Sequence, residues 1–86
     1  MIAFINVNDE PSLGPSGMVR VYSEPSGADI YVDGMKQGQT PVDSLIVRTG
    51  LHTLLVRLDD YQDWTGTVQV GQGEMKFIPT IKLHKK

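Results

Sequence analysis

The sequence predicts an all-β fold: an antiparallel β-sandwich of about seven short strands, immunoglobulin-like or transthyretin-like, with essentially no α-helix. From residue 18 onward, apolar and polar residues alternate with the period of two that is typical of strands with one buried face. Turn signals that contain Gly or Pro recur roughly every ten residues, and no window with helical periodicity is free of both. Because each half-buried sheet has one apolar face, we expect two sheets to cover each other.

The chain divides into three parts on composition. The N-terminal part holds an apolar run long enough for a short strand, followed by a stretch rich in Asn, Asp, Ser, Gly and Pro. It is interpreted as a segment that docks on a sheet edge, of this chain or of a neighbour. The basic C-terminus is interpreted as a frayed, solvated end rather than a binding tail. The expected parts are a strand and linker segment at 1–16, a sandwich domain at 17–83 and a disordered basic tail at 84–86.

The first strands of the domain flank a corner formed by Pro25 and Gly27. Asp33-Gly34 predicts a two-residue hairpin, with Met35 on the returning strand, because both residues tolerate the positive φ that such a turn requires. The residues expected on the inner face of these strands are Val19, Val21, Ala28, Ile30 and Val32.

The second half of the domain continues the alternation. Residues 42–48 predict a strand, and 51–58 and 61–70 predict two more. We expect residues 71–74 to form a hairpin loop into a last strand over Met75, Phe77, Ile81 and Leu83. Pro79 indicates that this strand is an edge or carries a bulge, because Pro cannot donate to the ladder. The inner face here comprises His52, Leu54, Val56, Leu58, Trp64, Val68 and Val70.

Composition limits the functions that the chain can have. Its 86 residues contain no Cys, so disulfides, thiolate metal sites and a Cys nucleophile are excluded. The net charge is −2 and the basic residues are scattered, which argues against a nucleic-acid partner. Residues 1–5 are too short for a signal-peptide core, and we expect no transmembrane segment.

Few side chains suggest chemistry, so we expect no enzyme activity and no cofactor. His52 and His84 are the only His residues, and His52 is expected to be a boundary residue hydrogen-bonded to a neighbour. Asp59, Asp60 and Asp63 offer oxygen ligands for a weak surface calcium site, but turn formation explains them better.

Four residues form the candidate ligand or partner surface. Tyr22 and Tyr31 are expected on the outer face of adjacent strands, with Arg20 and Asp29 beside them. Cross-strand aromatic pairing is the simpler explanation, and a platform for a sugar or a peptide is the alternative. Trp64, by contrast, is expected to anchor the core.

An ordered set of motifs runs through the domain: Pro25-Ser26-Gly27-Ala28, Asp33-Gly34, Gly38-x-Thr40-Pro41, Gly50-x-His52, and Tyr61 with Trp64. This set resembles the PEGA domain, a small β-sandwich module of microbial surface and envelope proteins. Ser26 replaces the Glu of the name-giving Pro-Glu-Gly-Ala, and Asp60 stands where family members usually have Gly. The resemblance implies that the matching residues shape the fold and that there are no catalytic residues to carry over. These residues are Pro25, Gly27, Ala28, Asp33, Gly34, Gly38, Thr40, Pro41, Gly50, His52, Tyr61 and Trp64.

The resemblance also implies a role. It suggests a non-catalytic structural or protein–protein interaction module, located in the cell envelope or outside the cell, whose partners are other chains or domains of a surface assembly. The alternative is a carbohydrate-binding module for cell-wall polysaccharide that uses Tyr22 and Tyr31. Without a signal peptide in the chain, a cytoplasmic location stays open, and so does the question whether this is a whole protein or one domain.

Overall fold

The structure is a computed structural model that describes residues 15–86. The segment at 1–14, which holds most of the predicted strand and linker, lies outside the described residues. Within them there is no helix, and the strands are β2 (Ser16–Val21), β3 (Ser23–Glu24), β4 (Asp29–Val32), β5 (Met35–Gln39), β6 (Val42–Arg48), β7 (Gly50–Arg57), β8 (Trp64–Val70), β9 (Met75–Phe77) and β10 (Ile81–Lys82).

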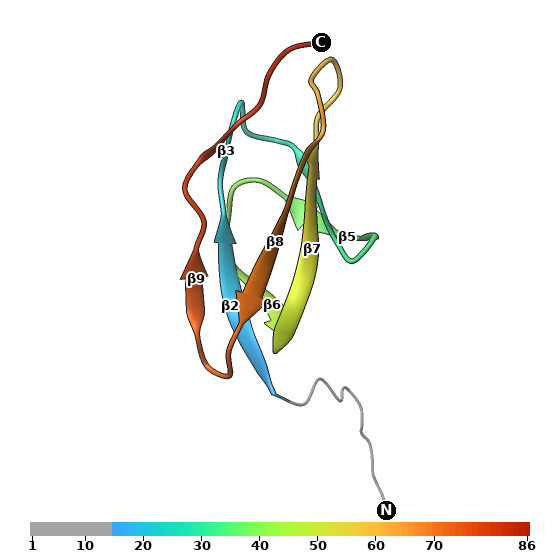
Figure 1. The fold of residues 1–86 in the computed structure, drawn as a ribbon. Coiled ribbons are helices and arrows are strands. Elements are labelled where there is room, and N and C mark those ends of the chain that lie inside the picture. Colours follow the sequence, from blue (N-terminus) through green and yellow to red (C-terminus); the bar gives the residue numbers. More distant parts are fainter. Residues whose placement is uncertain (1–14) are drawn as a thin grey trace, which may run out of the picture.

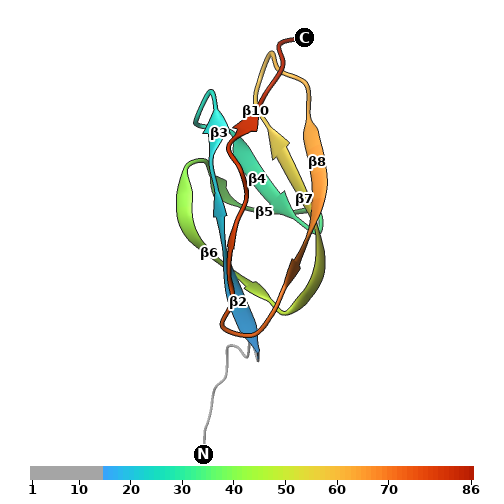
Figure 2. The ribbon, with the colours of Figure 1, turned by 60° about the vertical axis from the view of Figure 1, so that its left-hand side comes forward.

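The strands form two layers that face each other, as Figures 1 and 2 show. One layer is a four-stranded sheet in the order β5-β4-β7-β8, and the other is a three-stranded sheet in the order β6-β2-β9. The short pair of β3 and β10 follows β2 and β9 toward the end of the domain that holds the C-terminus. The all-β prediction is therefore confirmed, and the arrangement is sandwich-like.

The core lies between the two layers and contains side chains from both. The predicted inner faces are confirmed at Val19 and Val21 of β2, which are 1% and 0% exposed. The alternation of apolar and polar residues therefore identified the correct face of β2 and β4, whereas Phe77 of β9 is 65% exposed. The buried apolar residues are Val19, Val21, Ala28, Ile30, Val32, Val47, Leu54, Val56, Val68, Val70, Ile81 and Leu83.

The predicted hairpin between β4 and β5 is confirmed. Asp33 and Gly34 have φ values of 52° and 87°, and Val32 pairs with Met35 across the turn. Two positive φ values are the signature of the tight turn that matches the twist of the flanking strands.

Two strand pairings differ from the antiparallel prediction. β9 runs parallel to β2, and β10 runs parallel to β3. The cause lies at residues 71–74, which do not form the predicted hairpin loop: they carry the chain from β8 in one sheet to β9 in the other. Sequence alternation is the same for parallel and antiparallel strands, so it could not distinguish these arrangements. The described residues also contain more strands than the seven expected.

Pro79 has the effect that the sequence indicates. It lies between β9 and β10, in a short stretch that belongs to neither strand. Met18 pairs with Met75, an offset of 75 − 18 = 57, whereas Ser23 pairs with Ile81, an offset of 81 − 23 = 58. The segment that contains Pro79 therefore has one residue more than the segment it faces, and β9 is an edge strand of its sheet.

The C-terminal residues 84–86, expected to be disordered, make backbone hydrogen bonds. Gln62 N donates to His84 O over 2.7 Å, and Lys86 N donates to Asp60 O over 3.0 Å. Tyr61 and Lys85 form an antiparallel bridge between these two bonds.

Candidate interaction surfaces

Thr40 links three parts of the family motif from a buried position. Its side chain is next to Ser23, with 2.6 Å between the two hydroxyl oxygens, and its Oγ1 accepts a hydrogen bond from Ala28 N at 3.0 Å. Its backbone exchanges further bonds with Gly27 and Ala28. Thr40 is 3% exposed, so these bonds are shielded from water.

The direction of each hydrogen bond in this cluster follows from the donors available. Ser23 donates its single hydroxyl hydrogen to Pro25 O, 2.7 Å away. Its oxygen must therefore accept from Thr40, while Thr40 accepts from the Ala28 amide. The result is a continuous chain of donors across the corner before β4, which makes Thr40 a structural residue and explains why the motif contains it.

His52 links three elements at the turn of the β4–β5 hairpin, which is the end opposite Thr40. Its Nδ1 lies 2.6 Å from Asp33 Oδ2, and its Nε2 lies 2.7 Å from Arg48 O. Asp33 also accepts from the Thr53 amide at 2.9 Å. The His52 side chain is 13% exposed. The prediction of a boundary His bonded to a neighbour is thus confirmed.

The two partners of His52 determine its charge. Both are acceptors, so each ring nitrogen must carry a hydrogen, and only the imidazolium form has two. The hydrogen bond to the Asp33 carboxylate raises the pKa of His52 above its ordinary value, against a smaller lowering by burial. The same bond, together with the Thr53 amide, lowers the pKa of Asp33. The contact is a charged link between the β4–β5 turn, the end of β6 and the start of β7.

Arg20 and Tyr22 lie together on the outer surface of the three-stranded layer. The Arg20 guanidinium carbon is 4.4 Å from the centre of the Tyr22 ring and 5.6 Å from the centre of the Phe77 ring. Both distances are within the range of cation–π attraction. The Tyr22 hydroxyl bonds to Asp43 on β6. Arg20, Tyr22, Phe77 and Pro79 are among the residues that line a shallow hollow of about 290 Å³.

Tyr31 and Asp29 lie elsewhere, which corrects the prediction of adjacent strands. They belong to β4 in the four-stranded sheet, whereas Arg20 belongs to β2 in the other layer, so the four predicted residues form two separate sites. Asp29 bonds to Gln39 at 2.9 Å, and that bond is the main reason why its pKa is lowered. The sequence could not show that the chain changes sheets at the Pro25 corner.

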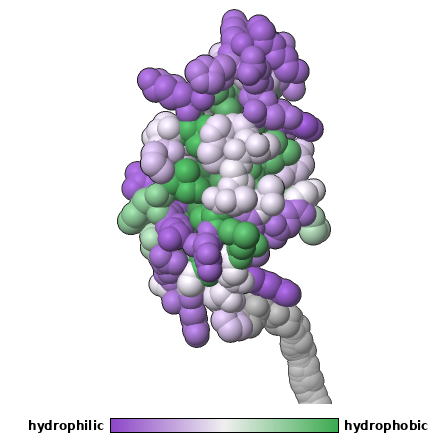
Figure 3. All heavy atoms as spheres, viewed as in Figure 1, coloured by the Kyte–Doolittle hydropathy of each residue, from purple (hydrophilic) through white to green (hydrophobic). Residues whose placement is uncertain are grey.

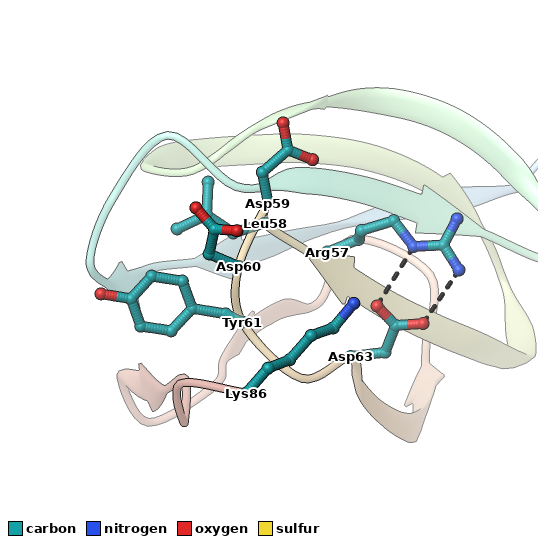
Figure 4. Close-up of a pocket in the computed structure, with 7 residues that line it drawn as sticks. All are labelled: Arg57, Leu58, Asp59, Asp60, Tyr61, Asp63 and Lys86. Carbon is teal, nitrogen blue, oxygen red and sulfur yellow. Dashed lines mark hydrogen bonds and ion pairs between the residues drawn. The ribbon is translucent and has the colours of Figure 1, made fainter.

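A larger, polar hollow of about 490 Å³ lies at the end of the domain near the C-terminus (Figure 4). Arg57 and Asp63 face each other there through two hydrogen bonds, of 3.1 and 2.9 Å, which lower the pKa of Asp63. Asp59 and Asp60 point away from that pair in Figure 4. Within residues 15–86, no group of three or more carboxylate or His side chains is placed to hold a metal ion.

Exposed apolar side chains are the surface feature that the sequence did not identify. Met35 and Ile46 are 69% and 57% exposed and share a hollow of about 240 Å³, whose lining includes the edge of the core at Val32 and Val47. On the face seen in Figure 3, hydrophobic residues gather around the middle of the domain, between two mostly hydrophilic ends. Period-two alternation marks the apolar residues of a strand as candidates for its inner face. The pattern therefore does not indicate that Met35 and Ile46 lie at the surface.

The remaining motif residues serve the fold. Gly50 begins β7 with a φ of 120°, and Gly38 lies where the pairing of β4 and β5 shifts register. Tyr61 and Trp64 are partly buried and pack against the core, so the predicted role of Trp64 as a core anchor is confirmed at the margin of the core rather than at its centre. Glu24–Pro25 and Thr40–Pro41 are cis peptide bonds.

The fold and these surfaces define a small all-β module whose motif residues are used for turns and core packing. The PEGA domain family matches the chain over residues 16–85, nearly its whole length, and the chain belongs to that family. Membership indicates a surface or extracellular module. No curated protein matches the chain. No helix in the described part of the chain has the length and apolar character needed to span a membrane.

Proposed function

We propose that this chain is a non-catalytic structural or protein–protein interaction module, part of a larger assembly of the cell envelope or cell surface. The observation that supports the proposal is that the motif residues of the chain serve its fold, whereas several large apolar side chains outside the motif are exposed. The family motif is used inside the domain, as at Thr40 and in the Asp33-Gly34 turn. The apolar side chains of Met35, Ile46 and Phe77 are left exposed on the surface, in two separate hollows.

Exposed apolar side chains that share a hollow favour contact with another protein. Met35 and Ile46 come from the edges of two different layers, β5 and β6, with buried Val47 beneath them. A protein side chain placed between them would bury apolar surface worth about 25 cal/mol per Å². The hollow suits an apolar anchor residue of a partner better than it suits a polar metabolite.

Binding to envelopes from the source organism tests the proposal. The purified chain should sediment with the envelopes, and treating the envelopes with protease beforehand should abolish the binding. Met35→Ser combined with Ile46→Ser should weaken the binding, whereas Leu51→Ser, the same kind of change at another exposed site, should not. Failure to bind untreated envelopes would contradict the proposal.

The alternative proposal is a carbohydrate-binding module. Phe77, 65% exposed beside Tyr22 and Arg20, favours it, because an exposed ring next to a guanidinium suits a sugar face and its hydroxyls. The argument against the predicted pair of tyrosines is that each has an Arg over its ring: Arg20 over Tyr22 at 4.4 Å and Arg57 over Tyr31 at 6.0 Å. A sugar would have to displace these cations.

The two proposals predict opposite results with treated envelopes. A carbohydrate-binding module should keep its affinity after protease digestion and lose it after the polysaccharide is removed. NMR shifts caused by purified cell-wall polysaccharide should then localise to Tyr22 and Phe77. If no polysaccharide moves these resonances, the carbohydrate proposal fails.

A further inference from the structure

β8 is a terminal strand of the four-stranded sheet, and within residues 15–86 it pairs with β7 alone. In Figure 2 it runs along one margin of the domain. Its seven residues, Trp64–Val70, include no charged residue and no Pro. A long uncharged edge of this kind is a template for pairing with another strand.

The other edges carry the features that prevent such pairing. β5 contains Lys36 and a shift in register, and β6 contains Asp43 and Arg48. β9 has only three residues and is followed closely by Pro79. Short length, charge, irregularity and Pro are the usual ways in which proteins protect a sheet edge. β8 is thus the least protected edge in the described part of the chain.

The register of the sheet shows which backbone groups of β8 are free. Asp33 N donates to Thr53 O, so Thr53 directs its backbone groups toward β4. Backbone direction alternates along a strand, so Leu54 and its even-numbered neighbours in β7 bond to β8, where Gly66 is the partner of Leu54. The residues of β8 that direct N–H and C=O groups to the free edge are therefore Thr65, Thr67 and Gln69.

We propose that β8 pairs in antiparallel register with β8 of a second copy of this chain, about a two-fold axis at Thr67, and so joins two four-stranded sheets into one. The proposal rests on the interaction role proposed above and adds a second copy of the chain as a partner, at an edge that shares no residue with the hollow of Met35 and Ile46. Thr67 would face Thr67 of the second copy, and Thr65 would face Gln69. These are the residues with free backbone groups, so the pairing would form about six hydrogen bonds.

The side chains of β8 suit this two-fold register on both faces. On the outer face, where Thr65, Thr67 and Gln69 are exposed, the facing pairs are Thr with Thr and Thr with Gln, which can hydrogen-bond across strands. No charge faces a like charge. A slip of one residue would place these polar side chains over the inner face, so the alternation fixes the register.

On the inner face, the same register brings apolar groups together. A Cβ atom at Gly66 would lie 2.7 Å from Cη2 of Trp64, so the indole ring of Trp64 lies directly over Gly66. Gly66 would face Val68 of the second copy, and Trp64 would face Val70. Val68 and Val70 are already only 9% and 2% exposed, so the gain in apolar burial would come from the partly buried Trp64 ring at the new seam.

Two variants and a control test the pairing in the full chain by analytical ultracentrifugation over a wide concentration range. The unmodified chain should shift from monomer to dimer as concentration rises. Thr67→Lys places two like charges opposite each other and should raise the dissociation constant at least tenfold. Thr67→Pro removes a free N–H that makes no bond to β7, so it should abolish the dimer while leaving the fold intact. Thr53→Lys adds the same charge to the same face, on the residue that pairs with Thr67 in β7, and should dimerise normally.

Amide hydrogen exchange shows whether the dimer uses the proposed edge. The amides of Thr65, Thr67 and Gln69 should gain protection as concentration rises, whereas those of Gly66 and Val68 should be protected throughout by β7. A monomer at every concentration, or a dimer without that alternating gain, would overturn the proposal. So would a dimer that appears only after residues 1–14 are deleted, because that segment would then occupy the edge. Envelope binding is measured independently of dimer formation. A failed dimer proposal would therefore leave the proposed function standing, and the reverse also holds.

Discussion

Replacing Thr40 with Val tests the buried hydrogen-bond chain at the centre of the family motif. Val has nearly the same shape, so the substitution removes the hydroxyl without leaving a cavity. The Ala28 amide would lose its only side-chain acceptor at a position that is 0% exposed. An unsatisfied buried amide costs about 1–3 kcal/mol, and the lost bond to Ser23 costs about 1 kcal/mol more. We therefore expect the free energy of unfolding to fall by about 2–4 kcal/mol.

Urea unfolding at 25 °C measures this loss directly. Trp64 is the only Trp and packs against the core, so its fluorescence reports the transition. For a domain of this size, the expected loss corresponds to a decrease in Tm of roughly 10–25 °C. Thr40→Ser keeps the hydroxyl and should cost only the burial of one methyl group, about 1 kcal/mol. Thr53→Val, on the exposed face, should change stability by less than about 0.5 kcal/mol. A loss below about 1 kcal/mol for Thr40→Val would contradict the buried hydrogen bonds assigned to the Thr40 hydroxyl.

Two further predictions concern stability. His52 has a raised pKa and is charged when bound to Asp33 and Arg48. Its contribution to the free energy of unfolding should be complete below its ordinary pKa of about 6.5 and should be lost as the pH rises through the higher pKa of the folded state. The urea midpoint should therefore fall as the pH rises across that range. His52→Gln should remove this dependence, and an unchanged pH profile would contradict the charged link. Gly17→Ala should destabilise the domain by at least about 2 kcal/mol, because its Cβ would lie 2.5 Å from Val70 Cγ1 and 2.6 and 2.8 Å from two backbone oxygens of the β8–β9 loop. Native-like stability of that variant in thermal unfolding would show that the two layers are less closely packed there.

Local signals in the sequence were sufficient for the β4–β5 hairpin and for the buried face of the strands before it. The Asp33-Gly34 step adopts the two positive φ values that a tight hairpin requires, and the alternation before it buries Ile30 at 0% exposure. These features depend on neighbours within a few residues, so no knowledge of topology was needed. The interruption of the last strand at Pro79 was predictable for the same reason, because the lack of an N–H is a property of that residue alone.

The candidate surface was not predictable in this way, because it depends on which strands become neighbours. Tyr22 and Tyr31 have the same local pattern, yet the chain changes sheets at the corner between them. Phe77 contacts Arg20 only because the 71–74 loop carries β9 across to lie parallel to β2. A hairpin at the same loop would have kept Phe77 next to β8 in the other layer. Alternation and turn propensity are compatible with both paths.

The same limit explains why β8 did not stand out in the sequence. Trp64–Val70 reads as an ordinary half-buried strand, and the absence of charge would have no consequence in a central strand. It matters only because the chain leaves that sheet after β8, so that β8 ends the layer with the backbone groups of Thr65, Thr67 and Gln69 unused by β7. Most motif residues of this chain form turns or pack in the core, so a partner at β8 would be recognised by residues outside the motif. For this chain, the edge that combines free backbone groups with a self-complementary pattern is β8.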